Sequence, residues 1–213
     1  MWTLFPVEQD TPIHIRGLTP KGAPQRHPVN VTINARDFPD VSERQAEAVE
    51  IALRHNDAGY NVYTTINPVL SSFTGDDGLA VCDCDIACRR LLLIDIDRTG
   101  YPKKPATAGE IEEAGHVADR IVEYLSGKFD PPFRVMSGNG IHLYLPVGDI
   151  LNDAASAQLC QQVLVGLGDK FDTDTLKVDR GVFNAGRITK FLGTIARKGD
   201  ETLGRPFRLA HLL

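Results

Sequence analysis

The order of regular segments between residues 91 and 179 constrains the fold of this chain more than any other feature of its sequence. A buried-strand pattern at Leu91–Asp97 is followed by a helical pattern, two strands around Gly138-Asn139-Gly140, a second helical pattern and a short strand at Leu176–Asp179. This βαββαβ order is typical of the ferredoxin-like arrangement. We therefore predict an α+β fold whose antiparallel sheet has the first strand at its centre, flanked by the third and fourth.

Capping signals define both helices of this unit. Thr107 and Glu110 match a capping box, and apolar residues at helical spacing then continue to Gly127. Asp153 is suited to cap the second helix, whose apolar face ends at Phe171. Both helices are therefore expected to cover the sheet.

The first ninety residues predict a separate α/β module. Residues 6–40 are rich in proline and read as short strands and loops, and Val62–Ile66 alternates as a strand does. Between them, Ser42 and Gln45 predict a helix start, with Gly59 at its end. Its predicted apolar stripe is Ala46, Val49, Ala52 and Leu53. We expect one domain, made of an N-terminal module (1–90) and a catalytic module (91–213).

Charge and composition narrow the class of protein. The chain has 213 residues and a net charge of −5, which argues against a basic coat over the whole surface. Residues 177–198 nevertheless hold six basic residues and one acidic residue, a pattern suited to phosphate binding or to a solvated face. No apolar run reaches the ~20 residues of a membrane helix, and the start lacks a basic signal segment. We expect a cytoplasmic protein with no membrane partner.

Two aspartates end the first strand of the βαββαβ unit. Asp95 and Asp97 stand two residues apart, so they point to one face of the strand while Ile94 and Ile96 point to the other. Adjacent carboxylates repel each other, and a hard divalent cation relieves that repulsion with oxygen ligands. Such a pair also occurs in glycosyltransferases and haloacid-dehalogenase-type phosphatases, and it can be two solvated side chains at a strand end. The sequence thus predicts a cation site without fixing the reaction.

A glycine turn precedes a histidine that is expected to face these aspartates. Ser137-Gly138-Asn139-Gly140 can present backbone N–H groups to a phosphate, although it can also be a plain hairpin turn. His142 opens the strand antiparallel to the first, so it is expected near Asp97.

A third carboxylate, Asp179, is a candidate partner for the first two in a two-metal site. Its placement is a difficulty, because a last strand antiparallel to the first puts Asp179 near Leu91 rather than near Asp97. Either the strand boundaries or the path of the chain must differ from the prediction. Basic residues follow, and are expected to bind a triphosphate or a template backbone; they include Arg187, Lys190, Arg197 and Lys198.

These three elements, in this order, resemble the archaeo-eukaryotic primase superfamily, in particular the primase-polymerase domains of phages, plasmids and mobile elements. Leu92–Asp97 is similar to the family's hydrophobic strand ending in Asp-x-Asp, and Ser137–His142 to its nucleotide-contacting motif. Val178-Asp179 is similar to the third motif, a hydrophobic residue before the last metal-binding aspartate. The resemblance covers about residues 60–200 and implies an RRM-like catalytic sheet beside an N-terminal α/β module.

The resemblance implies roles for individual residues. Asp95, Asp97 and Asp179 are expected to bind two Mg²⁺ or Mn²⁺ ions, and the catalytic set is these three with His142. The expected nucleotide-binding residues are Ser137, Gly138, Asn139, His142, Arg187, Lys190 and Arg197, with Asn184 as a further candidate. The implied activity is template-dependent DNA priming or polymerisation, by nucleotidyl transfer from an NTP or dNTP to a 3′-hydroxyl on single-stranded DNA.

Other functions stay open at the level of sequence. A metal-dependent nuclease, an untemplated nucleotidyltransferase, or a non-catalytic RRM-like module of a replication initiator would fit parts of the pattern. Family members are often fused to a helicase or a C-terminal helical domain, so we expect such a partner, and the chain as an excised domain, in a prokaryotic or phage-infected cell. Cys82, Cys84 and Cys88 do not match the usual Cys-x2-Cys spacing of a zinc site.

Overall fold

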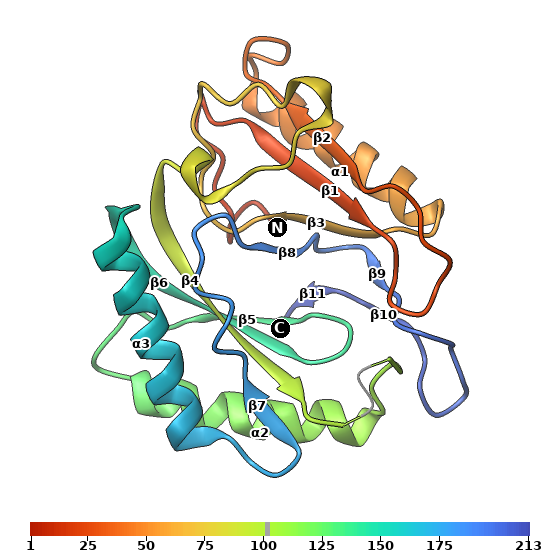
Figure 1. Ribbon diagram of the computed structural model, residues 1–213, viewed down its shortest axis with the longest axis vertical. Helices are drawn as coiled ribbons and strands as arrows, with labels where there is room; N and C mark the ends of the chain where they lie inside the picture. Colours follow the sequence, from red (N-terminus) through yellow and green to blue (C-terminus); the bar gives the residue numbers. More distant parts are fainter. Residues whose placement is uncertain (101–102) are drawn as a thin grey trace.

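The computed structural model describes residues 1–100 and 103–213. Three sheets and three long helices make up this part of the chain (Figure 1). The helices are α1 (Val41–Asp57), α2 (Ala108–Leu125) and α3 (Ala154–Phe171), and two 3-10 turns are η1 (Asp76–Gly78) and η2 (Asp83–Asp85). The strands are β1 (Ile13–Leu18), β2 (Val29–Ile33), β3 (Asn61–Thr65), β4 (Cys88–Arg98), β5 (Phe133–Met136), β6 (Ile141–Leu151), β7 (Leu176–Val178), β8 (Ile188–Lys190), β9 (Ile195–Ala196), β10 (Arg208–Leu209) and β11 (His211–Leu212).

The larger sheet has the predicted βαββαβ core. Its strand order is β11-β5-β6-β4-β7, so β4 lies between β6 and β7 as expected, and the paired strands are antiparallel. Helices α2 and α3 pack against this sheet, in the lower part of Figure 1. The α+β fold class predicted from the sequence is therefore confirmed.

The smaller sheet combines both halves of the chain. Its order is β2-β1-β3-β8, so β8, which follows Asp179 in sequence, pairs with β3 from the first ninety residues. Helix α1 packs on β1 and β3, and their shared core includes Ile15, Val62 and Phe191. A two-stranded sheet of β9 and β10 completes the structure. The division at residue 90 stays a prediction, but β8 joins the two modules through main-chain hydrogen bonds.

Two details of the α1 prediction were wrong. The N-cap is Asp40, whose carboxylate accepts hydrogen bonds from the amides of Ser42 and Glu43, rather than Ser42 itself. The buried face is also displaced, because Val49 and Leu53 are exposed. The residues that α1 does bury are Arg44, Ala48, Ile51, Ala52 and Asn56. Arg44 is accommodated because its guanidinium donates to three main-chain carbonyl groups.

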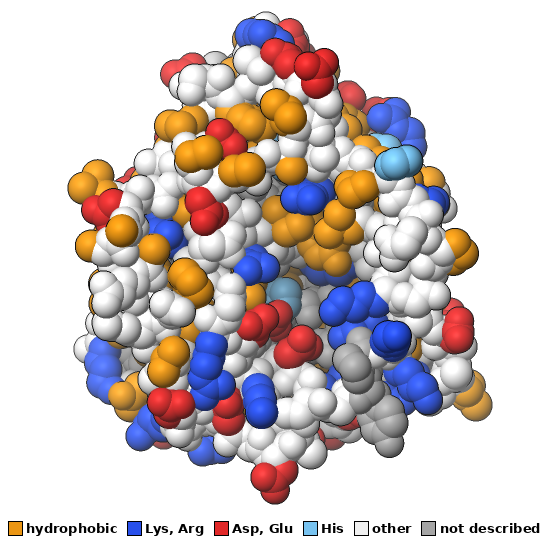
Figure 2. Space-filling model, in the orientation of Figure 1, with side chains coloured by type: hydrophobic (Ala, Val, Ile, Leu, Met, Phe, Trp, Pro, Cys, Tyr) orange, Lys and Arg blue, Asp and Glu red, His pale blue; other side chains and the backbone are white. Residues whose placement is uncertain are grey.

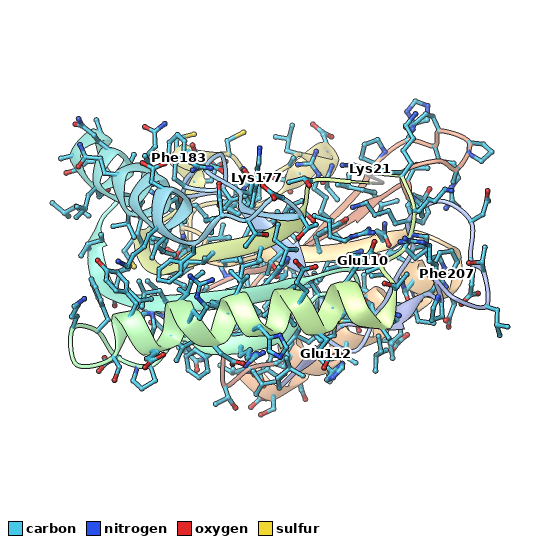
Figure 3. All side chains as sticks on the ribbon, turned by 90° about the horizontal axis from the view of Figure 1, so that it is seen from below. Lys21, Glu110, Glu112, Lys177, Phe183 and Phe207 are labelled. Atoms are coloured by element: carbon cyan, nitrogen blue, oxygen red, sulfur yellow. The ribbon has the colours of Figure 1, made fainter. Side chains whose placement is uncertain are left out.

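The caps of the other two helices agree with the sequence. Thr107 and Glu110 form a reciprocal capping box, and Asp153 accepts from the amide of Ser156. Figure 3 shows Glu110 at the end of α2 that lies beside the C-terminal segment, where Phe207 is labelled. Within the described residues, none of the helices combines the length and the apolar character needed to cross a bilayer.

Candidate active site

A cleft of about 410 Å³ contains nearly all of the residues that the sequence singled out. Both large sheets supply its walls, and Figure 2 shows acidic and basic side chains gathered around a hollow on this face. Its polar lining includes Asp95, Asp97, Asp179, Ser137, Asn139, His142, Arg187, Lys190, Arg197 and Lys198. The candidate carboxylates and the candidate phosphate-binding groups therefore share one space.

Strand register brings the third carboxylate to the first. Because β7 has only three residues and pairs with the last residues of β4, Val178 lies opposite Ile96. The amide of Asp179 then donates to the main-chain carbonyl of Asp95 at 2.9 Å. The expected placement of Asp179 near Leu91 was wrong, since it assumed that β7 pairs along the whole of β4.

His142 lies directly opposite Asp95 in the β4–β6 pairing. Its Nε2 atom is 3.3 Å from Oδ1 of Asp95. Burial acts to raise the pKa of the Asp95 carboxyl, but His142, Lys198 and Arg187 together hold the pKa below its ordinary value. Asp95 is therefore ionised at neutral pH and can only accept hydrogen bonds.

Asp97 sits in the opposite electrostatic situation. Partial burial in the cleft and the charge of Asp95 raise its pKa, with Lys198 and Lys21 acting against them. Its outer side is open to solvent, which screens these effects. The carboxylates of Asp95 and Asp97 thus repel each other, and a bound cation would relieve this repulsion.

The β5–β6 turn is a tight structural element at the rim of the cleft. Ser137 donates to the carbonyl oxygen of Gly140 through its amide and its hydroxyl, each at 3.0 Å. Gly138 has a φ of 101°, and a Cβ there would lie 2.2 Å from Cβ of Ala196. Asn139 accepts from the amide of Ala106 through Oδ1 at 3.0 Å. Of the four predicted turn and strand residues, Ser137, Asn139 and His142 line the cleft, whereas Gly138 packs against β9 instead.

Basic side chains form the wall opposite the carboxylates. Lys190 is 8% exposed, and its Nζ lies 4.4 Å from the centre of the Tyr63 ring. Burial, followed by repulsion from Arg197, lowers the pKa of Lys190 to about 7. Within the described residues, three buried nitrogens of this wall have no hydrogen-bond partner: Lys190 Nζ, Arg197 Nη1 and Arg187 Nε. Unsatisfied buried donors of this kind suit an anionic ligand.

The carboxylate oxygens are suitable ligands for a divalent cation, although the three side chains do not converge on one position. In the described part of the chain, no three His, Cys, Asp or Glu side chains are grouped closely enough to enclose an ion. Asp179 uses Oδ1 to accept from the amide of Gly181 at 2.8 Å, which leaves Oδ2 for another partner. Carboxylate oxygens are the ligands that Mg²⁺ and Mn²⁺ prefer.

The sequence carries no signal for two residues of the cleft, and one further candidate lies outside the cleft lining. Lys21 lines the cleft and acts on Asp97, but it lies in a loop with no recognisable pattern. Thr189 also lines the cleft, and nothing in its sequence context marks it. Asn184 is not in the cleft lining; its amide donates to Oδ1 of Asp83 at 3.1 Å and helps to fix the loop before β8.

Comparisons with known proteins add a likeness in fold. No protein-family model matches the sequence, and no curated protein matches it. Among solved structures, the polymerase domain from Mycobacterium tuberculosis Ligase D in complex with DNA superposes with a TM-score of 0.47 and 14% identity, over 94% of this chain and 74% of that one. The catalytic domain of primase Repb' in complex with initiator DNA gives 0.44 and 12%, over 93% and 76%. At these identities, the roles of the cleft residues rest on their own geometry.

Proposed function

We propose that this chain is a template-dependent DNA primase-polymerase domain, which transfers a nucleotidyl group from an NTP or dNTP to a 3′-hydroxyl on single-stranded DNA. The observation that carries the proposal is the cleft itself. Three aspartates share it with basic side chains that carry buried nitrogens without a hydrogen-bond partner in the described residues. His142 on β6 lies beside Asp95 on β4, and Asp179 follows β7 on the other side of β4. Phosphoryl transfer needs this combination, because positioning and charge neutralisation provide most of its catalysis.

The reaction joins two substrates through one phosphorus atom. The oxygen of the 3′-hydroxyl bonds to the α-phosphorus of the nucleotide, the bond from that phosphorus to the bridging oxygen breaks, and pyrophosphate leaves with the bonding electrons. The hydroxyl proton passes to solvent or to a cleft base. In this proposal Asp95, Asp97 and Asp179 would hold two divalent cations, whose charge would favour ionisation of the hydroxyl and offset the charge of the phosphates.

The chain's own cations take the rest of the triphosphate. Lys190, Arg187 and Arg197 line the cleft, each has a buried nitrogen without a hydrogen-bond partner in the described residues, and their side chains would hydrogen-bond the non-bridging oxygens. Phosphate binding would also favour the charged form of Lys190, whose pKa is held near 7 by burial. In this proposal the basic side chains orient the nucleotide, and the aspartates position the cations at the reacting phosphate.

Incorporation of labelled nucleotides on single-stranded DNA tests the proposal, with Mg²⁺ and Mn²⁺ in separate reactions. We expect products with an annealed primer, without one, or both, and none from an Asp95→Ala/Asp97→Ala double variant. A matched control is Asp169→Ala/Asp174→Ala, which removes two exposed carboxylates outside the cleft lining. Cleavage of DNA or addition that ignores the template would contradict the proposal and favour a nuclease or an untemplated transferase.

A further inference from the structure

A second hollow lies beside the cleft and shares two of its aspartates. Asp97 and Asp179 line both spaces, and among the described residues no others are common to the two linings. The volume of this outer hollow is about 310 Å³, and its lining is completed by Arg98, Thr99, Lys177, Val178 and Arg180. The two carboxylates therefore stand at the junction of two spaces, each with its own basic residues.

The pairing of β4 with β7 places Lys177 beside these carboxylates. Lys177 lies directly opposite Asp97 in this antiparallel pair, and side chains of directly opposite residues project from the same face of a sheet. Lys177 is exposed, and Figure 3 shows it on the same side of the molecule as Lys21, which lines the cleft. A strand arriving from solvent can therefore reach the Lys177 amine without entering the cleft.

Lys177 differs from the other two cations of the outer hollow in its partners. Arg98 forms an ion pair with Glu110 at 2.8 Å, and Arg180 forms ion pairs with two aspartates at the end of α3. Within the described residues, the Lys177 amine has neither an ion pair nor a hydrogen bond. The two arginines thus hold parts of the fold together, whereas Lys177 is available to an anionic ligand.

The geometry of phosphoryl transfer gives the two spaces different tasks. The attacking and the leaving oxygen lie roughly in line on opposite sides of the phosphorus. In the proposed function the triphosphate is held in the cleft by Lys190, Arg187 and Arg197, so pyrophosphate leaves on that side. Because the outer hollow meets the cleft only at Asp97 and Asp179, a hydroxyl that enters from it reaches the aspartates outside the triphosphate-binding part of the cleft.

The exposure of the outer hollow also suits a polymer. Asp97, Thr99, Lys177 and Asp179 are all exposed, whereas Lys190 in the cleft is buried. A strand that is extended at its end must keep its remaining nucleotides outside the protein, and a single nucleotide has no such need. The exposed space is therefore the better match for the strand, and the cleft for the nucleotide.

We propose that the outer hollow binds the 3′-terminal nucleotide of the primer strand, and that Lys177 binds the last phosphodiester of that strand. This inference rests on the proposed function, because the strand end bound there is the one that attacks the nucleotide in the cleft. Since an ion pair at an exposed site is screened by solvent and salt, its loss should weaken primer binding several-fold rather than abolish it.

Binding of fluorescent DNA, without nucleotide or added metal, tests the role of Lys177. Lys177→Met should weaken binding of a primed template about fivefold, while binding of the unprimed template stays unchanged. The slope of log affinity against log salt should also become shallower by about 0.7–0.9 for the primed template. Lys177→Arg, which keeps the charge, should bind as the wild type does. The matched control is Lys170→Met, at an exposed lysine on α3 outside both linings, and it should change none of these values.

A primer with one neutral methylphosphonate tests which phosphate Lys177 binds. Placed at the last linkage, this substitution should raise KM for the primer about fivefold in the wild type and cause no further rise in Lys177→Met. KM for the nucleotide should stay unchanged in both proteins. The same substitution far upstream should act equally on the wild type and on Lys177→Met.

The outcomes separate this inference from the proposed function. Wild-type affinity for primed DNA in Lys177→Met, or an equal effect of the last methylphosphonate on both proteins, would overturn the inference even if nucleotide addition follows the template. Binding of primed DNA that depends on Lys177, in a wild-type protein that adds no nucleotide, would support the outer hollow as a site for a strand end and contradict the proposed function.

Discussion

For single residues, the sequence predicted which carboxylates form the site, but it did not predict the burial and the pKa of the basic residues. The strand alternation of Asp95 and Asp97 predicts their shared face, and the antiparallel pairing of β4 with β6 brings His142 beside this pair, opposite Asp95. The lowered pKa of Lys190 could not be predicted, because it depends on burial and on repulsion from Arg197, and the Tyr63 ring beside the amine comes from another segment. Local pattern therefore identifies the chemistry, whereas the pKa of each group is set by tertiary contacts.

Lys190 should destabilise the ligand-free protein at neutral pH. Its pKa is about 7 in the fold and near 10.5 in the unfolded chain, so unfolding takes up a proton between these values and stability rises with pH across that window. Lys190→Met should therefore raise the free energy of unfolding at pH 7 by about 1–3 kcal/mol and flatten its rise toward pH 10. Urea denaturation at several pH values measures both.

Lys177→Met is the matched control for this prediction, because Lys177 is exposed on β7 (Figure 3). It should leave the stability curve unchanged. A Lys190→Met protein that is less stable than the wild type at pH 7 would show that the amine has a stabilising partner. The same variant should also bind nucleotide more weakly, so its gain in stability comes with a loss of activity.

At the scale of elements, short strands and loops decide how the site is assembled. The β7 strand was predicted in the right place, but its length of three residues decides which part of β4 it meets. The pairing of β8 with β3 was not predictable from periodicity, since the two strands are separated by more than a hundred residues. A short segment carries no sequence pattern that identifies a distant pairing partner. A helix cap such as Thr107 does have a local pattern, because its partner Glu110 is three residues away.

Asp83 should be important for the loop between β7 and β8. Its Oδ1 accepts from the amide of Gly186 at 2.7 Å and from the side chain of Asn184, and this loop leads to Arg187 in the cleft. Asp83→Ala should lower stability by about 1 kcal/mol and raise KM for the nucleotide several-fold. Asp130→Ala, at another exposed aspartate outside the cleft lining, should change neither quantity. Wild-type KM in Asp83→Ala, despite the loss of stability, would show that Arg187 does not need this support.

Glu110 should make the junction of α2 with the C-terminal segment sensitive to acid. It accepts hydrogen bonds from Arg98 and Arg205. Burial acts to raise the pKa of Glu110, but Arg205, the Thr107 amide and Arg98 together hold it at about 2. A depressed carboxyl pKa stabilises the fold above its ordinary value of 4.5, and this stabilisation is lost as the pH falls toward 2.

Glu110→Gln should therefore lower the free energy of unfolding by about 1–3 kcal/mol at pH 7. The difference in this free energy from the wild type should shrink between pH 4.5 and 2. Glu112→Gln, on the same helix, is the control and should have little effect. Thermal unfolding across this pH range measures the difference. A gap between Glu110→Gln and the wild type that stays constant down to pH 2 would contradict the assigned pKa.

At the scale of the whole molecule, the cleft exists because two sheets from different parts of the chain meet there. The larger sheet supplies the aspartates and His142, and the smaller sheet supplies Tyr63, Thr189 and Lys190. The βαββαβ order predicted the first of these sheets well. The second was expected only as an accompanying module, and its direct contribution to the cleft became visible with the β3–β8 pairing.

In the proposed function a DNA template decides which nucleotide is added, and single-nucleotide incorporation measures this choice. A primer would be annealed to four templates that differ only in the first unpaired base, and each nucleotide would be supplied alone with Mn²⁺ or Mg²⁺. We expect extension mainly by the complementary nucleotide on each template, and no extension by Asp95→Ala/Asp97→Ala. Extension by the same nucleotide on all four templates, or no extension by the wild-type protein with either cation, would contradict it.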